Sequence, residues 1–144
     1  MNAYLNQYKN NQIFSASPEQ IMIMLYDGAI RFLTQAIQGI DEGNIELKNN
    51  GINRAMAIVM EFRNTLDHNI GGEIAANLDS LYDFMIREMI QANIKKDRQK
   101  LQAVHAMLSD LRDTWKEAII IARNESQAVA NATPANYQPL KASL

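Results

Sequence analysis

The chain has 144 residues, and its 14 basic and 16 acidic side chains leave a net charge of -2. This balance lacks the basic surface that nucleic-acid binding requires, so we expect no nucleic-acid partner. Cysteine is absent, which excludes disulfide bonds, thiol catalysis and sulfur-ligated metals. The polar N-terminus has no signal-peptide core, and Asp27 and Arg31 interrupt the best candidate membrane span. The sequence therefore predicts a cytosolic protein without membrane insertion.

The first 16 residues are mostly polar, with apolar side chains only at spaced positions such as Tyr4 and Tyr8. We expect residues 1–16 to form an N-terminal arm outside the folded domain. A helix start follows: Ser17 can act as the N-cap, proline at the next position suits a first turn, and Gln20 completes a capping box. This start predicts the first helix from residue 18 to about residue 41.

The first helix carries more apolar residues than one packed face uses. Its apolar positions fill an arc of roughly 220°, whereas a surface helix needs a stripe only modestly wider than about 100°. One stripe from Leu25 to Ala36, through Gly28 and Phe32, is the predicted core side. The stripe of Ile23, Ile30 and Ile37, flanked by Tyr26, lies on another side.

Three further helices are predicted. The apolar residues of the second share one face over 52–66, and the adjacent glycines at 71–72 supply a corner that tolerates positive φ. The third helix covers 74–94. Asp97 is the expected N-cap of the fourth helix, whose core face runs over 101–122. No segment shows the alternation of a strand.

Short connections between four helices indicate an all-α fold, an antiparallel up-down four-helix bundle over residues 17–125. Beyond this bundle the chain is rich in Ala, Asn, Pro and Gln. We expect residues 126–144 to form a flexible tail.

The histidines do not match the Glu-x-x-His pattern of di-iron bundles, because Thr65 precedes His68 and Gln102 precedes His105 by three residues. No glycine-rich phosphate loop or paired carboxylates appear either. The sequence therefore predicts no catalytic residue, no metal, no cofactor and no enzymatic activity. An alternative left open is a signalling bundle that carries phosphate on His105.

Apolar residues that the bundle core does not need indicate contact with a partner. On the third helix, Ile86, Ile90 and Ile94 form a ridge spaced by four residues. Methionine is abundant, with 8 residues, and its flexible side chain suits a surface that adapts to helices. The predicted partner-binding residues are Tyr4, Tyr8, Ile23, Tyr26, Ile30, Ile37, Ile58, Met60, Ile86, Ile90, Ile94, Ile120 and Ile121.

The block from Ser17 to Leu33, which includes SPEQI and MLYDGAIRFL, resembles the flagellar secretion chaperone FliS family. Further matching blocks follow in the same order at residues 71–85, 92–97 and 108–115. The resemblance implies a cytosolic four-helix chaperone that binds the helical C-terminal segment of flagellin and prevents premature polymerisation. It also implies delivery of flagellin to the flagellar type III export gate.

In this family the N-terminal arm is implicated in covering the groove and contacting partners, which is the place that Tyr4 and Tyr8 occupy here. We expect a monomer or a weak dimer. An obligate helical homo-oligomer, in which the surplus apolar faces meet each other, stays open as an alternative. Which interhelical groove binds the ligand also stays open.

Overall fold

The computed structural model describes residues 17–132, which form four helices and, within that range, no strand. The helices are α2 (Pro18–Glu42), α3 (Ile45–Asn64), α4 (His68–Lys95) and α5 (Arg98–Ala132). This confirms the predicted all-α fold. The predicted arm and the last part of the predicted tail, residues 133–144, lie outside the described residues.

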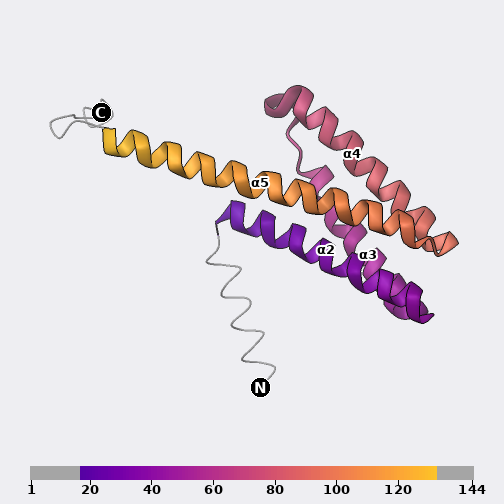
Figure 1. Ribbon diagram of the computed structural model, residues 1–144. Coiled ribbons are helices and arrows are strands. Elements are labelled where there is room, and N and C mark those ends of the chain that lie inside the picture. The colour runs from indigo at the N-terminus through magenta and orange to yellow at the C-terminus, as the bar shows by residue number, and fades with distance from the viewer. Residues whose placement is uncertain (1–16, 133–144) are drawn as a thin grey trace, which may run out of the picture.

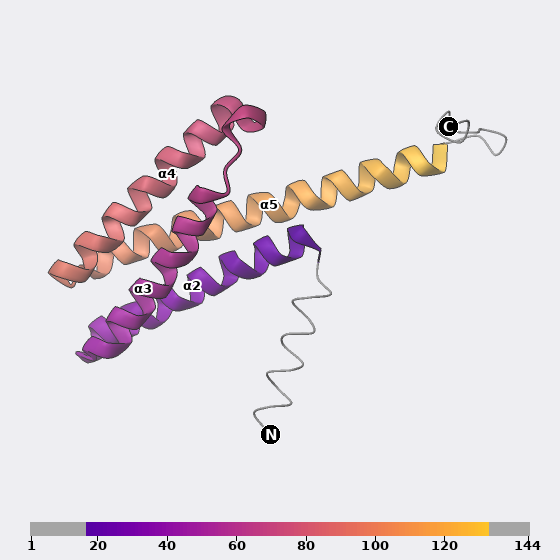
Figure 2. The ribbon, with the colours of Figure 1, turned by 180° about the vertical axis from the view of Figure 1, so that it is seen from behind.

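The four helices form an up-down bundle in which each packs against two neighbours. Helix α2 contacts α3 and α5, and α4 contacts the same two helices from the opposite side. Figures 1 and 2 show that α4 and α5 diverge from the turn that connects them. Both views also show α5 extending well past the first turn of α2. One end of the bundle is therefore more open than the other.

The start of α2 has the predicted caps. The Ser17 hydroxyl accepts a hydrogen bond of 3.2 Å from the backbone nitrogen of Gln20, and the Gln20 side chain accepts one of 2.9 Å from the Ser17 nitrogen. The N-cap backbone is extended, and Pro18 occupies the first helical position. The helix therefore has a defined first residue.

Helices α2 and α3 approach closely because glycines line their contact. A Cβ atom at Gly51 would lie 2.5 Å from the backbone oxygen of Phe32, and one at Gly39 would lie 2.5 Å from the backbone nitrogen of Lys48. Lys48 is itself buried, and its Nζ donates a 3.0 Å hydrogen bond to the backbone oxygen of Asn93 near the end of α4. This bond satisfies one of the carbonyls that a helix end leaves without an intrahelical donor.

The predicted glycine corner is present. Gly72 has a φ of 52°, which a residue with a side chain adopts only with strain, and it interrupts the helical backbone after the first turn of α4. The Asp67 carboxylate caps that turn. The second helix is shorter than its apolar pattern suggested, because α3 ends at Asn64 and Leu66 packs against the core from the connection.

One apolar stripe from each helix forms the core. The stripe predicted as the core side of α2 is confirmed in part, because Gly28 and Ala36 are buried but Leu25 is 36% exposed. Leu33, on the adjacent stripe, is fully buried. On α5 no residue after Leu108 is buried. The buried core consists of Tyr26, Ala29, Leu33, Ala36, Ile52, Ala55, Val59, Phe62, Tyr82, Met85, Ile86, Met89, Ala92, Leu101, Val104 and Leu108.

Helix α5 does not end near residue 125, as the sequence suggested, but continues to Ala132. Alanine, the best helix former, occurs at positions 128, 130 and 132, and the first proline of this region comes only at position 134. The first seven residues assigned to the tail are therefore helical.

Candidate partner-binding groove

An open groove of about 740 Å³ runs between the start of α2 and the second half of α5. Its apolar residues on α5 are three and four positions apart, the spacing that presents one continuous stripe to a neighbouring helix. Small residues in this stripe, Ala118 and Ala122, leave room for another chain. The groove is lined by Ser17, Glu19, Met22, Trp115, Ala118, Ile119, Ala122, Arg123, Ser126 and Gln127.

Trp115 connects this groove with the core. Its indole Nε1 donates a hydrogen bond of 3.1 Å to the hydroxyl of Tyr26, which lies 2.7 Å from the hydroxyl of Tyr82. The ring of Phe62 stacks on that of Tyr26, with centroids 4.3 Å apart. Because these four residues come from α5, α2, α4 and α3, all four helices help to hold the indole in place.

The two tyrosines of this cluster stay protonated well above neutral pH. Burial raises the pKa of Tyr82, and its hydrogen bond with Tyr26 raises it further. Burial also raises the pKa of Tyr26, although its hydrogen bonds with Tyr82 and Trp115 oppose the shift. The cluster therefore acts as a neutral hydrogen-bonded unit and not as an acid or a base.

Below the groove, α2 and α5 are joined by three polar contacts that we call the polar seam. Each step of seven residues forward on α5 matches a step of seven back on α2, so the antiparallel register is constant. The contacts of the seam are Arg98 Nε to Asp41 Oδ1 at 2.8 Å, His105 Nε2 to Thr34 Oγ1 at 3.2 Å, and Arg112 Nη1 to Asp27 Oδ1 at 3.0 Å.

The groove begins where the polar seam ends. One further step of seven places Ile119 opposite Gln20, and the apolar side chain of Ile119 cannot continue the series of polar contacts. Ile119 instead lines the groove. Polar contacts therefore join the two helices along the first half of α5, and the groove lies between them along the second half.

A smaller pocket of about 350 Å³ lies within the polar seam, beside His105. This histidine is half-buried at the contact of α2 and α5. Arg98 and Gln102 line the same pocket, together with Ile37. Two hydrogen bonds already hold Arg98 to Asp41.

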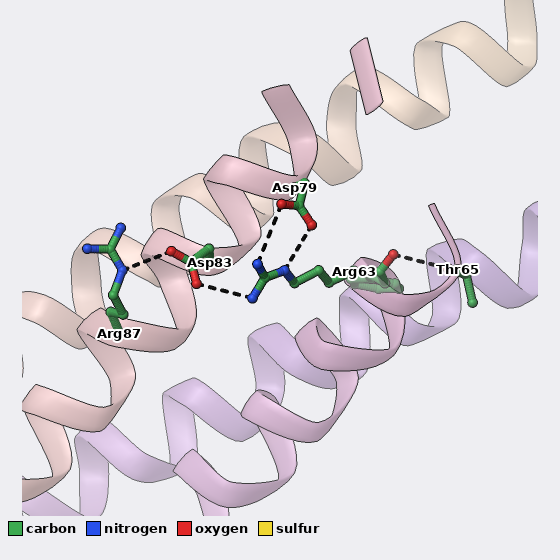
Figure 3. Close-up of polar contacts among 6 residues, drawn as sticks. Arg63, Thr65, Asp79, Asp83 and Arg87 are labelled. Carbon is green, nitrogen blue, oxygen red and sulfur yellow. Dashed lines mark hydrogen bonds and ion pairs between the residues drawn. The ribbon is translucent and has the colours of Figure 1, made fainter. Parts of the chain in front are cut away.

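A charged network fixes the end of α3 to the middle of α4 (Figure 3). The Arg63 guanidinium bonds the carboxylates of Asp79 at 2.9 Å and Asp83 at 3.1 Å, and Arg87 bonds the second oxygen of Asp83 at 3.0 Å. The hydrogen bond from Arg63 lowers the pKa of Asp79. This network ties α4 to α3, the neighbour on the side away from α5.

Two of the predicted partner-binding residues belong to the core. Tyr26 is 1% exposed and Ile86 is 7% exposed, so neither offers a free surface. The ridge on α4 therefore consists of Ile90 and Ile94, which are exposed. Tyr4 and Tyr8 lie outside the described residues.

The stripe of Ile23, Ile30 and Ile37 faces α5 and is half-buried. It lies on the flank of α2 that carries the side chains of the polar seam. Ile30 and Ile37 pack against the core, so bundle packing accounts for them, whereas Ile23 stays a predicted partner contact. Ile58 is likewise half-buried and faces α2, since a Cβ atom at Gly28 would lie 3.6 Å from its Cδ1. The predicted residues that remain exposed are Met60, Ile90, Ile94, Ile120 and Ile121.

Sequence reasoning missed most of the groove because it placed Trp115 and Ile119 on the core face of the last helix. A signal was present. The residues at 98, 105 and 112 are polar or charged at heptad spacing, and the next member of the series is Ile119. A change from polar to apolar residues along one flank of a helix marks the point at which that flank stops facing the polar residues of its neighbour.

The described part of the chain contains no group of three His, Asp or Glu side chains that could hold a metal ion. None of the four helices has the length and apolar character needed to span a membrane, among the residues that the structure describes.

Comparison with known proteins identifies the family. The family model for the flagellar protein FliS matches residues 1–123. The chain belongs to this family. A flagellar secretion chaperone FliS of Bacillus subtilis is 37% identical over 82% of this chain and 87% of its own length. FliS proteins of Salmonella typhimurium and Vibrio cholerae are also 37% identical, over 80% and 81% of this chain and 86% of each relative.

This FliS family member continues as helix α5 from residue 124 to residue 132, beyond the region that the family model matches. The groove crosses that border. Ser126 and Gln127 of its lining lie after it, and Arg123 is the last matched residue. The outer end of the groove is therefore formed by sequence that the family model leaves out.

Proposed function

We propose that this protein is a cytosolic export chaperone that binds the helical C-terminal segment of flagellin. By covering that segment it prevents premature polymerisation, and it delivers flagellin to the flagellar type III export apparatus. It acts by binding and not by catalysis. Family membership and the names of the relatives, which are secretion chaperones, support this proposal.

The single observation that carries the proposal is the open groove between α2 and α5. An amphipathic segment can bury its apolar stripe against Met22, Trp115 and Ile119, which is the helix-in-groove mode of recognition. The hydrogen bond from Trp115 to Tyr26 holds the indole before a ligand arrives, which reduces the entropy cost of binding.

A disordered segment that folds on binding loses several kcal/mol to ordering, so a short contact would give weak affinity. We propose that the bound segment extends beyond the groove to other exposed apolar residues. Ile120 and Ile121 flank the groove on α5, and Ile90 and Ile94 lie on α4 with Met60 on the adjacent α3. A segment that follows these positions would wrap around the bundle.

The phosphotransfer alternative has less support. His105 Nε2 already contacts Thr34 Oγ1, and the one cation in its pocket, within the described residues, is held by Asp41. Neither group is available to a phosphate without breaking the polar seam.

Calorimetric titration of the full chain with a peptide of the flagellin C-terminal segment from the same bacterium tests the proposal. We expect micromolar or tighter binding, a gain of helical circular dichroism and a negative heat-capacity change. Trp115 is the only tryptophan, so its fluorescence reports directly on the groove. Absence of both heat and helix gain would refute the proposal.

Two matched variants locate the site. Ile119→Asp places a charge in the groove and should weaken binding about tenfold or more. Ile45→Asp makes the same change at an exposed residue at the start of α3, near the opposite end of α2, and should bind like the unmodified chain. Equal effects of both variants would show that the groove is not the binding site. Sedimentation over a concentration series separates a monomeric chaperone from an obligate oligomer.

A further inference from the structure

Arg123 is a basic residue on the flank of α5 that faces α2, beyond the point where α2 begins. It lies 11 residues after Arg112, and 11 residues are about three helical turns, so both side chains leave the helix on the same side. In the register of the polar seam, Arg112 lies opposite Asp27, and Arg123 lies opposite position 16, which precedes the first residue of α2. The flank of α5 around Arg123 therefore points towards the place that α2 would occupy if it began earlier in the chain.

The arginines of the polar seam are paired, whereas Arg123 has no ion-pair partner among residues 17–132. Arg98 bonds Asp41 and Arg112 bonds Asp27, while Arg123 forms no ion pair within residues 17–132. Glu19 lines the same groove from the α2 wall but is not within ion-pair distance of Arg123. The pattern of base on α5 and acid on its neighbour thus stops when α2 stops.

The N-terminal cap of α2 prevents the same helix from supplying the missing acid. Ser17 has an extended backbone, its capping box is complete, and Pro18 follows. The residue before a proline disfavours helical geometry, and a proline has no backbone N–H to continue a helix backwards. Residues 1–16 and 133–144 contain no Asp or Glu, so an acidic side chain that pairs with Arg123 must come from another chain.

We propose that Arg123 is a specificity-determining residue that selects an amphipathic helix with a carboxylate on one flank. The apolar stripe of that helix lies on Met22, Trp115 and Ile119, and its acidic side chain pairs with the guanidinium as Asp27 pairs with Arg112. This inference rests on the proposed function, because the occupant is the partner segment that the groove binds. To the proposed function it adds a rule for which partner helices the groove accepts.

The chemistry favours selection over raw affinity. Arg123 is exposed, so an ion pair there contributes little free energy, but it fixes the register of the bound helix and excludes a base at that position. A planar guanidinium suits a carboxylate through two parallel hydrogen bonds. The effect should decline with salt, since exposed charges are screened over about 10 Å at 0.1 M ionic strength.

A charge-reversal experiment tests this inference. The full chain, Arg123→Glu and Lys116→Glu are titrated with the flagellin C-terminal peptide at about 50 mM and about 500 mM salt. Lys116 is the matched control, because it lies one heptad earlier on α5, is exposed and does not line the groove. A set of peptides in which each acidic residue is replaced singly by lysine completes the design. Thermal unfolding by circular dichroism verifies that both variants fold.

We expect Arg123→Glu to weaken binding roughly three- to tenfold at low salt and less at high salt. Lys116→Glu should weaken binding less than Arg123→Glu does at low salt. One lysine-substituted peptide should restore the affinity of Arg123→Glu. Two results would overturn the role of Arg123 while leaving the proposed function standing, provided that the unmodified chain binds the peptide. One is an equal loss of affinity in both variants, and the other is that no lysine-substituted peptide restores the affinity of Arg123→Glu. Failure of the unmodified chain to bind would overturn both.

Discussion

The two halves of α5 have similar apolar spacing but different surroundings. In the first half, Leu101, Val104 and Leu108 are fully buried, and three polar contacts join the helix to α2. In the second half, Trp115 and Ile119 continue the pattern but line an open groove. The difference arises because α2 begins at Pro18 and α4 diverges, so the neighbours end before α5 does. The same stripe is core where it is covered and a docking surface where it is not.

The largest expected difference between the two halves of α5 is the loss of unfolding free energy on substitution by alanine. Leu108→Ala should lower the free energy of unfolding by about 2–5 kcal/mol, because it opens a cavity in a packed core. Ile119→Ala, the matched change in the groove, should cost less than about 1 kcal/mol, since its surroundings are already open to water. Urea unfolding followed by circular dichroism measures both values. Similar losses would mean that the second half is packed as tightly as the first.

The next effect concerns the junction of the two halves. Tyr82→Phe should lower the free energy of unfolding by about 1 kcal/mol at pH 7, because the Tyr26 hydroxyl loses a buried partner. Burial raises the pKa of Tyr82 in the folded protein. Its stabilising contribution is therefore full below about pH 10, the unfolded value, and declines as the pH rises further.

The variant cannot ionise at position 82, so the stability difference between the two proteins should shrink above about pH 10. Urea midpoints from pH 7 to 11 measure this. A difference that stays constant over that range would contradict the buried, neutral state of Tyr82.

A smaller effect should come from the last contact of the polar seam. Arg112→Leu should lower the free energy of unfolding by about 0.5–1 kcal/mol, because the pair with Asp27 is partly exposed. Adding Asp27→Leu should restore most of the loss, since two apolar side chains then replace two charges. Thermal unfolding of the single and double variants measures the coupling. Strictly additive losses would show that the two residues do not interact.

The smallest effect lies away from the groove, in the network between α3 and α4. The hydrogen bond from Arg63 lowers the pKa of Asp79, so its contribution to stability is present above about pH 4 and is lost as the pH falls through the lower folded value. Asp79→Asn should therefore flatten the acid side of the stability profile. Melting temperatures between pH 2 and 7 check this, with Asp110→Asn as an exposed control on α5. Identical profiles for all three proteins would contradict a role for the network.

Local sequence determined the elements of this fold. Ser17, Pro18 and Gln20 fixed the start of α2, and Gly72 adopts the positive φ that its position suggested. These features depend on backbone and capping chemistry within a few residues, which a sequence displays directly. The helical spacing of apolar residues predicted four helices, and the family blocks pointed to the right family.

The assignment of apolar stripes to core or surface was not local. Tyr26 and Ile86 were predicted to meet a partner and are buried, whereas Ile119 falls within the predicted core face of the last helix and lines the groove. Trp115 does both, since it packs against the core and lines the groove. The apolar arc of α2 has room for three stripes, towards the centre, α3 and α5, and periodicity cannot assign them.

The sequence by itself therefore determined what forms: four helices, the caps at Ser17 and Asp97, the turn at Gly72 and the excess of apolar residues. Only the tertiary structure decided where the excess becomes accessible. That position depends on the relative lengths of α2 and α5, because α2 begins at Pro18 and cannot cover the part of α5 that continues to Ala132. A hydrophobic side chain carries the same signal in the sequence whether a neighbour covers it or not, and the neighbour is set by residues about one hundred positions away.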